Sequence, residues 1–205
     1  SNFDGFVLKL DANGDFVWAY QLGGISNDGT KAVATDPSGN VVVTGYFQGT
    51  VDFDNGPASA SFSSQGAADI FTVKLSNTGA FLWAKQIAGT QDHFANAIAT
   101  DDLGNIYLGG KFRQTIHFAP PSGLPLATGY NNDQAFICQY SPNGTVNWRE
   151  AFSGSGIHIN ALTVDNGYLY TAGLFYVDAQ FGTGTSLVVA SGTESAFVDK
   201  QPQSG

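Results

Sequence analysis

The sequence predicts an all-β protein assembled from repeated units, and three observations support this fold class. The three tryptophans, Trp18, Trp83 and Trp148, are separated by 65 residues in each case. The segments that precede them resemble one another, which indicates a repeat whose units bury their core against their neighbours. Only 12% of the residues are charged, whereas 13% are aromatic and 26 are glycine, a balance typical of short strands and tight turns. We therefore expect almost no helix.

The repeated segment has the pattern of an antiparallel hairpin. Its copies run over residues 4–18, 69–83 and 134–148. In the first copy, apolar residues recur at every second position, at Phe6, Leu8 and Leu10, as on one face of a β-strand. A polar turn that contains glycine follows, and the returning strand carries the tryptophan.

A second hairpin follows in each unit. In the first unit, residues 31–35 and 40–47 flank a turn over 36–39, Asp-Pro-Ser-Gly, with proline and glycine where a type I turn favours them. The second unit repeats this plan over 95–112. In the third unit the turn is two residues shorter, and its Asn166 and Gly167 favour a tight two-residue turn.

Four strands per period, at 31–35, 40–47, 70–75 and 81–87, predict β-propeller blades of four antiparallel strands. We expect residues 1–205 to form one array of about three repeats of 61–65 residues. The repeats lie at about 4–68, 69–132 and 133–194, and a fourth starts at 195–205. Because closed propellers typically need about four to eight blades, we expect the chain to belong to a larger propeller or to complete one by self-association.

After each second hairpin comes a longer segment, which we call an excursion. The excursions cover 48–68, 113–132 and 176–195, and each forms either a small third hairpin or a loop. Loops that differ between repeats, while the strands agree, are where binding is expected in a repeat protein.

Several motifs recur at equivalent places. They are a lysine in the aromatic strand, an Asp-x-x-Gly-Asn turn at 36–40 and 101–105, and Gly-x-Phe at 45–47 and 110–112. As a set they resemble the SBBP type of beta-propeller repeat. That resemblance implies a secreted or cell-surface bacterial protein without a common enzymatic activity. The third repeat departs from the pattern because Gln139 replaces the lysine.

The tryptophans also bear some resemblance to those of quinoprotein dehydrogenase propellers. Those enzymes are expected to carry cofactor-stacking tryptophans and calcium ligands inside the ring. Here all three tryptophans hold the same place in the repeat, which favours a structural role. We expect no cofactor.

Charge and composition exclude some partners. The net charge is −9 and no basic run exists to neutralise phosphates, so nucleic acid is not expected to bind. No apolar run is long enough to cross a bilayer, so membrane insertion is not expected either. The single cysteine, Cys138, lies in an apolar run and is expected to be a small buried side chain.

The candidate metal ligands are Asp11, Asn13 and Asp15, since alternating oxygen side chains on a turn suit calcium. The equivalent residues of the other repeats mostly lack carboxylates, as in Ser76 and Ala80, so turn chemistry explains the acidic turn without a metal. Two further groups of polar residues have simpler interpretations than a metal site: the acidic group fits a solvated loop, and the histidines lack the spacing of a zinc site. They are the acidic excursion residues Asp52, Asp54 and Asn55 and the histidines His93, His117 and His158, of which His93 and His158 are 65 residues apart and could line one face.

No paired carboxylates, serine elbow or Cys–His pair identifies a catalytic site. The sequence favours a non-enzymatic scaffold or ligand-binding module that recognises a protein or a glycan through its excursions. The alternative is a fragment of a propeller glycosidase or lyase. Exposed aromatic and amide side chains suit sugar or peptide surfaces, and the candidates are Tyr46, Tyr130, Asn131, Asn132 and Tyr176.

Overall fold

The computed structural model describes residues 2–118, 125–127, 131–152, 154, 156–176, 178–181, 185–188 and 195–202. These residues form strands and no helix, which confirms the all-β prediction. They accordingly include no helix long and apolar enough to cross a bilayer.

Two complete blades occupy the middle of the molecule. The strands of blade 1, in sheet order, are β3 (Gly29–Thr35), β4 (Val41–Phe47), β7 (Asp69–Leu75) and β8 (Phe81–Gly89). The strands of blade 2 are β9 (Phe94–Thr100), β10 (Ile106–Phe112), β13 (Gln134–Tyr140) and β14 (Val146–Phe152). All neighbours are antiparallel, so the predicted four-stranded blade is confirmed.

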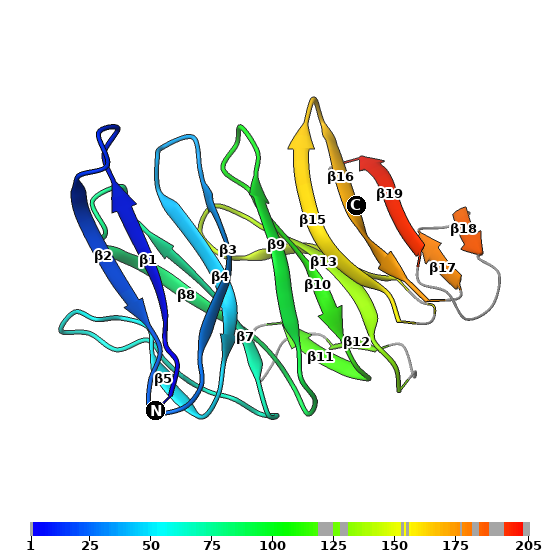
Figure 1. Cartoon of the computed structure of the whole chain (residues 1–205), viewed down its shortest axis with the longest axis horizontal. Helices are drawn as coiled ribbons and strands as arrows, with labels where there is room; N and C mark the ends of the chain where they lie inside the picture. Colours follow the sequence, from blue (N-terminus) through cyan, green and yellow to red (C-terminus); the bar gives the residue numbers. More distant parts are fainter. Residues whose placement is uncertain are drawn as a thin grey trace.

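An incomplete sheet lies on each side of these blades (Figure 1). On one side, β1 (Gly5–Leu10) pairs with β2 (Phe16–Leu22). On the other side, β16 (Tyr168–Phe175) pairs with both β15 (His158–Asp165) and β19 (Ser195–Pro202). No pairing within the described residues joins these two end sheets, so the structure shows a row of blades and not a closed ring.

The excursions contain small hairpins. Their strands are β5 (Thr50–Asp52) with β6 (Ser61–Ser63), β11 (Thr115–Phe118) with β12 (Pro125–Ala127), and β17 (Asp178–Phe181) with β18 (Thr185–Val188). Of the two alternatives, the hairpin is therefore observed. The sequence did not predict that β11 also pairs with β8, which extends the sheet of blade 1 to six strands.

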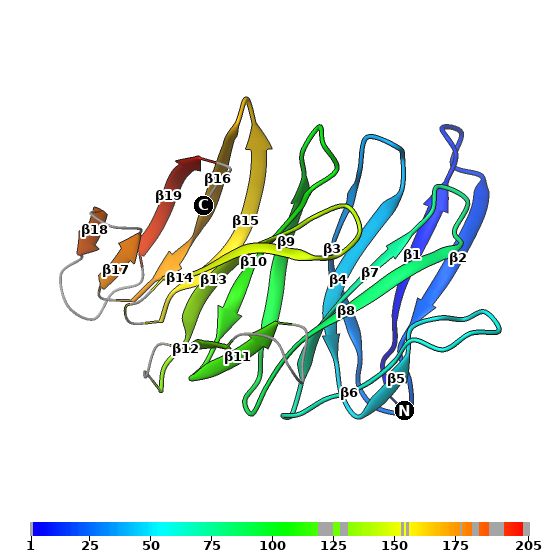
Figure 2. The same ribbon diagram turned by 180° about the vertical axis from the view of Figure 1, so that it is seen from behind.

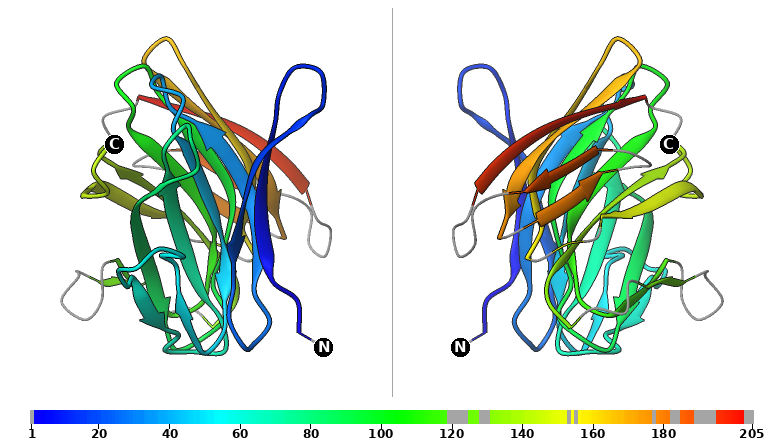
Figure 3. Two further views of the ribbon diagram at one scale, coloured as in Figure 1. Left: turned by 90° about the vertical axis from the view of Figure 1, so that its left-hand side faces the viewer. Right: turned by 90° about the vertical axis from the view of Figure 1, so that its right-hand side faces the viewer.

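The two ends of the sheets differ in character. The first strands of the blades, β3, β9 and β15, face the viewer in Figure 1, and the last strands, β8 and β14, face the viewer in Figure 2. Turns within hairpins lie toward one end, which we call the turn end, and the excursions lie toward the other, which we call the excursion end (Figure 3). The turns are 11–15, 36–40, 76–80, 101–105, 141–145 and 165–167.

The core lies between blades and not within one blade. Strands β7 and β13 are buried at every position, because a sheet covers each of their faces. Three separate clusters of apolar side chains fill the three spaces between successive sheets. Cys138 lies in the cluster between blades 1 and 2 and is fully buried, as the sequence predicted.

A glycine recurs in the second strand of each blade because the backbone of the first strand comes very close there. A Cβ atom added at Gly45, Gly110 or Gly173 would lie 2.0, 2.0 or 1.9 Å from the carbonyl oxygen of a first-strand residue. The register of each strand pair shifts near this point, as expected at a β-bulge. The glycine of the Gly-x-Phe motif is therefore required by the close approach of two backbones.

Candidate functional site

The tryptophans join successive blades at the turn end. The indole Nε1 of Trp18 donates to the carbonyl oxygen of Asn77 at 3.2 Å, and Lys9 Nζ donates to the same oxygen at 2.8 Å. One repeat later, Trp83 Nε1 and Lys74 Nζ both donate to the carbonyl oxygen of Pro142 at 3.1 Å. The repeated lysine and tryptophan therefore share one acceptor on the next blade's turn.

Each ring also lies against a turn glycine. A Cβ atom added at Gly79 would lie 2.9 Å from Trp18 Cδ2, and one added at Gly144 would lie 3.2 Å from Trp83 Cδ2. Both glycines have φ values near +80°, a conformation that favours glycine in any case. The tryptophans thus hold equivalent positions between blades, at the half-buried edge of the core.

The departure at Gln139 is compensated within its own blade. In blade 1, Lys74 Nζ forms a buried ion pair with Asp36 Oδ2 at 2.8 Å. Burial opposes ionisation of Asp36, but hydrogen bonds from Lys74 and Asn40 outweigh it and hold the pKa of this carboxyl below its usual value. In blade 2, the Tyr107 hydroxyl accepts from Gln139 Nε2 at 2.6 Å and donates to Asp101 Oδ2 at 3.0 Å. Tyr107 therefore spans the gap that the shorter glutamine leaves.

The predicted calcium candidates lie on the turn between β1 and β2. Asp11 Oδ1 accepts from the backbone nitrogens of Asp15 at 2.9 Å and Asn13 at 2.8 Å, and these bonds lower its pKa. Its carboxylate closes the turn, as the turn interpretation expects. The described residues contain no group of three His, Cys, Asp or Glu side chains placed to hold a metal ion.

The acidic residues of the first excursion have similar local roles. Asp52 Oδ1 accepts from the backbone nitrogen of Ala60 at 2.8 Å, and Asp54 Oδ1 accepts from that of Gly56 at 2.8 Å. Asn55 Nδ2 donates to the Gln21 carbonyl oxygen at 3.1 Å. These side chains order the excursion.

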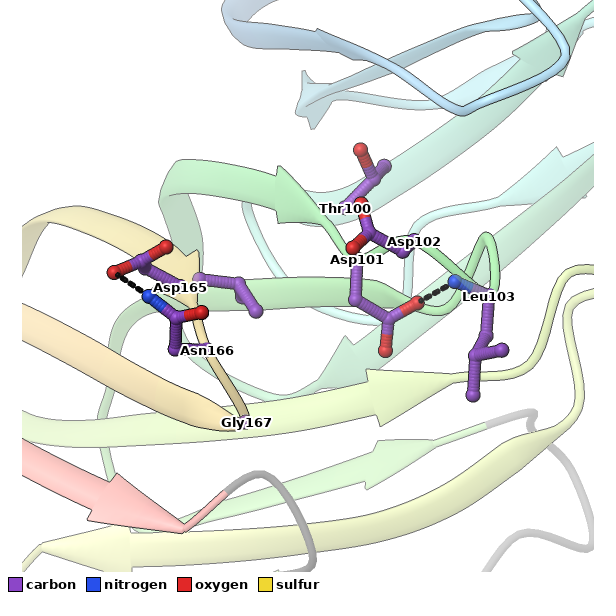
Figure 4. A pocket seen from close by; sticks show the side chains of 8 residues that line it. Thr100, Asp101, Asp102, Leu103, Asp165, Asn166 and Gly167 are labelled. Atoms are coloured by element: carbon purple, nitrogen blue, oxygen red, sulfur yellow. Dashed lines mark hydrogen bonds between the residues drawn. The ribbon is translucent and has the colours of Figure 1, made fainter.

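A cleft with a volume of about 210 Å³ lies between the turns of blade 2 and the last sheet. Figure 4 shows Asp102 and Asp165 on its two sides, while Asp101 accepts from the Leu103 backbone nitrogen within its own turn. This cleft was not predicted from the sequence. The sequence feature that could have predicted the cleft is the turn over 165–167. This turn is two residues shorter than its counterparts and leaves space beside the turn of blade 2.

A hydrogen bond between neighbouring sheets is also missing at this cleft. Between blades 1 and 2, Thr100 Oγ1 donates to the Thr35 carbonyl oxygen at 2.7 Å. The residue equivalent to Thr100 in the last sheet is Val164, which has no hydroxyl to make the corresponding bond. The lining is rich in hydrogen-bond acceptors. Asp101 and Asp165 already accept hydrogen bonds within their own turns.

The main concentration of charge lies at the excursion end of blade 2. Asp133 accepts from His158 Nε2 at 2.8 Å, from Lys111 Nζ at 2.7 Å and from Arg113 Nε. The bond from His158, together with those from Lys111 and Arg113, outweighs burial and holds the pKa of Asp133 well below its usual range. The carboxylate is largely buried, whereas the Arg113 side chain is 50% exposed.

Two aromatic rings adjoin this cluster. Lys111 Nζ lies 5.6 Å from the centre of the Phe94 ring, and Phe94 meets Tyr46 edge to face with ring centres 5.5 Å apart. Lys31 Nζ lies 5.4 Å from the centre of the Tyr46 ring. Cations and rings therefore alternate from blade 1 to blade 2.

The loop beside Arg113 carries backbone strain. Gln114 has φ +60°, whereas Gly49 holds the equivalent position in repeat 1 with φ +70°. A non-glycine residue in this conformation costs on the order of 1 kcal/mol, and such residues are concentrated at functional sites. Gln114 Nε2 donates to Asn131 Oδ1 at 3.1 Å, so the strained position presents an amide next to the cationic cluster.

The structure brings only some of the predicted ligand-binding residues together. Tyr46 contacts Phe94, whose ring lies beside Lys111, and Lys111 donates to Asp133. Asn131 accepts from Gln114, the residue that follows Arg113. Asn132 lies beside Asp133 and donates from Nδ2 to the Gly154 carbonyl oxygen at 3.5 Å. Tyr176 is exposed just after β16, and no contact within the described part of the chain joins it to this group. Tyr130 lies outside the described residues.

Sequence reasoning missed Phe94, Lys111, Arg113 and Asp133. The sequence feature that could have indicated them is that equivalent positions of the repeats hold unlike residues. Tyr46 in repeat 1 becomes Lys111 in repeat 2, since both face the start of the first strand of their blade. No pattern within one repeat could show that Asp133 would lie between Lys111 and His158, because that contact joins two sheets.

The histidines do not form one site. His93 is fully buried, and its backbone nitrogen donates to the Ala68 carbonyl oxygen, as Asp28 does to Phe3 and Ile157 to Asp133. His93 is therefore equivalent to Ile157 and not to His158. The expectation from the 65-residue offset is wrong because the third connection is one residue shorter. His117 lies on β11.

Comparisons with known proteins agree with the propeller architecture. Residues 82–111, from β8 to β10, match the model of the SBBP family, described as a beta-propeller repeat, which confirms the resemblance seen in the sequence. The chain is similar to an uncharacterized WD repeat-containing protein of Acanthamoeba polyphaga mimivirus, with 29% identity over 194 residues that cover 81% of this chain and 14% of that protein. It is also similar to the regulatory protein FlaEY of Caulobacter vibrioides, with 30% identity over 113 residues that cover 55% of this chain and 12% of that protein. This chain therefore spans only a small part of either relative.

Proposed function

We propose that this β-propeller repeat module is a non-enzymatic binding unit of a secreted or cell-surface protein and that it binds its ligand with the excursion end. The turn end joins the blades. The excursion end of blade 2 carries the exposed charged, aromatic and amide side chains described above, centred on Arg113.

One observation supports this division most strongly. At the turn end, Trp18 and Trp83 make equivalent contacts with the next blade. At the excursion end, equivalent residues differ in size and charge. The equivalent sets are Gly29, Phe94 and His158 in the first strands and Tyr46, Lys111 and Leu174 in the second strands. Side chains that differ between repeats at one end of a shared scaffold are typical of a binding surface on a repeat protein.

The alternative of a quinoprotein-like propeller finds less support. Trp18 and Trp83 lie on glycines of neighbouring turns, and Trp148 meets Tyr107 edge to face with ring centres 6.2 Å apart. All three tryptophans of the chain thus pack against residues of the blades.

A binding array tests the proposal. The purified chain is applied to arrayed glycans and peptides, and the Arg113→Ala variant is compared with Lys85→Ala, which removes a lysine that lies near the Gly144 turn at the opposite end. We expect selective retention by the wild type and Lys85→Ala and weaker retention by Arg113→Ala. Retention that Arg113→Ala leaves unchanged would contradict the location. Turnover of a labelled polysaccharide would favour the glycosidase or lyase alternative.

A further inference from the structure

We propose that the excursion end of blade 2 binds a carboxylate-bearing sugar, such as a uronate unit of an acidic glycan. This inference rests on the proposed binding function and names the ligand class. The site consists of Arg113 and Lys111 for the carboxylate, Gln114 and Asn131 for hydroxyl groups, and the rings of Phe94 and Tyr46 for the apolar face of the sugar.

The first argument is charge. Lys111 and Arg113 both pair with Asp133, and Lys31 lies beyond the Phe94 and Tyr46 rings; these three are among only 8 lysines and arginines in a chain of net charge −9. Within the described residues, Asp133 is the one carboxylate that pairs with Lys111 and Arg113, so this group keeps a positive charge even with His158 neutral. A local positive site on an acidic protein attracts an anion at short range while the rest of the surface repels it.

The second argument is the geometry of Arg113. Its Nε donates to Asp133, which fixes the guanidinium against the protein. Within the described residues the two terminal nitrogens make no hydrogen bond, and half of the side chain is exposed. Terminal guanidinium nitrogens form paired, parallel hydrogen bonds with a carboxylate. Arg113 is therefore held by one donor and presents two others to a ligand.

The third argument favours a sugar over an acidic peptide. Exposed Gln114 and Asn131 supply amide donors and acceptors beside Arg113, and amides suit ring hydroxyls. Phe94 and Tyr46 are partly exposed and suit the apolar face of a sugar ring. The strain at Gln114 gives independent support, because glycine would relieve it but would remove the amide.

The test measures binding of the whole chain to immobilised polygalacturonate, with dextran as the neutral polymer and polyglutamate as the acidic peptide. The variants are Arg113→Lys, Arg113→Gln and Gln114→Gly, and Lys85→Gln is the control for loss of one positive charge. Melting temperatures are measured for each variant, so that a folding defect is recognised.

We expect salt-sensitive binding to polygalacturonate and much weaker binding to the other two polymers. Arg113→Gln should weaken binding roughly tenfold to a hundredfold, as for loss of a charged hydrogen bond, and Arg113→Lys should weaken it less. Gln114→Gly should lower affinity while its melting temperature stays the same or rises, which a purely structural role for Gln114 would not produce. Lys85→Gln should bind as the wild type does.

Three results would overturn the proposal. They are no binding to polygalacturonate, equal binding to polyglutamate, and equal binding by Arg113→Gln. If the array described above shows a neutral glycan or a peptide bound in an Arg113-dependent way, the proposed function stands and the sugar class is wrong. If nothing is retained in an Arg113-dependent way, both proposals fail.

Discussion

At the scale of single residues, His93 is the clearest exception to the rule that buried polar groups are paired. The side chain is fully buried, and neither ring nitrogen has a hydrogen-bond partner within the described part of the chain. Burial disfavours the charged ring and lowers the pKa of His93 from 6.5 to about 4. At equivalent places, Asp28 accepts from the Gly24 and Gln48 backbone nitrogens, and Ile157 is apolar.

This burial predicts a pH dependence of stability. Unfolded His93 titrates near pH 6.5, so between about pH 6.5 and 4 the unfolded state takes up a proton that the folded state does not. The free energy of unfolding should therefore fall on acidification, by on the order of 3 kcal/mol from this residue. His93→Ile, which copies Ile157, should remove that slope and leave stability at pH 7 equal or higher.

Urea unfolding at several pH values measures this effect. The difference between His93→Ile and the wild type isolates the histidine, because Asp28 and Asp69, whose pKa values burial raises, contribute equally to both proteins with the opposite slope. Parallel stability curves for the two proteins between pH 7 and 4 would show that His93 does not carry the acid sensitivity.

Metal removal tests the acidic turn. Because Asp11 already accepts two backbone hydrogen bonds that close its turn, we expect EDTA to leave the melting temperature unchanged. A bound calcium ion would instead stabilise the folded state by mass action. A rise in melting temperature with added calcium that Asp15→Ala abolishes would establish calcium binding at Asp11, Asn13 and Asp15.

Individual site residues were the hardest feature to predict. Tyr46 and Asn131 were named as candidates because aromatic and amide side chains suit a sugar or peptide, and their role in binding stays a prediction. It could not identify Asp133, whose partners Lys111 and His158 come from different sheets. Contacts of this kind depend on how two blades are placed, which the period of one repeat does not specify.

At the scale of elements, the turn that each tryptophan contacts is the unit that joins blades. Trp83 provides ring contact with Gly144 and a hydrogen bond to Pro142. Trp83→Ala should lower the free energy of unfolding by about 3 kcal/mol, near the lower end for large aromatic truncations because the ring is half buried. Trp83→Phe keeps a ring and loses the indole donor, so a smaller loss of about 1 kcal/mol is expected. A loss below about 1 kcal/mol for the alanine variant in reversible unfolding would mean that this contact does not join the blades.

Blade 1 uses a Lys74–Asp36 ion pair where blade 2 uses hydrogen bonds among Gln139, Tyr107 and Asp101. We expect one arrangement to replace the other when its residues are exchanged together. Gln139→Lys together with Tyr107→Val gives blade 2 the Lys74 and Val42 arrangement of blade 1. Each single change breaks the contacts among Gln139, Tyr107 and Asp101, and we expect each to destabilise by about 1–3 kcal/mol. The double variant should be more stable than the sum of the single changes predicts. A double-mutant cycle with additive effects would show that the three residues are not coupled.

The strands were largely predictable because the alternation and the turn residues recur in every unit. The observed β3 begins two residues before the predicted segment, and β8 extends two residues beyond it. The added pairing of β11 with β8 was not predictable, because it depends on tertiary contact and not on a local pattern.

At the scale of the whole molecule, burial shows which faces are covered. The middle strands β7 and β13 are buried on both faces, whereas β1 alternates between buried and exposed positions. Large apolar side chains are uncovered on the outer face of the first sheet, where Phe6 is 65% and Phe16 is 69% exposed, and on the last sheet, where Val198 is 77% exposed. The equivalent faces inside the array are covered by a neighbouring blade.

Exposed apolar faces and unpaired strand edges favour association. We propose that this chain associates through its end sheets, which is one of the two alternatives that the count of blades predicts; the other is that the chain belongs to a larger propeller. Gly14 fits this proposal, because it occupies the place of Gly79 and Gly144 but has nothing within 4 Å of an added Cβ. A turn that can receive a tryptophan from another blade is thus present at the first sheet.

The most direct test of this account is the molar mass of the chain in solution, measured by light scattering after size exclusion over a range of concentrations. An open row of blades with uncovered end faces should give a mass above the 21.5 kDa of one chain, rising with concentration. Replacing Phe6 and Phe16 by serine should bring the mass toward that of one chain. A mass of 21.5 kDa for the wild type at every concentration would contradict the account.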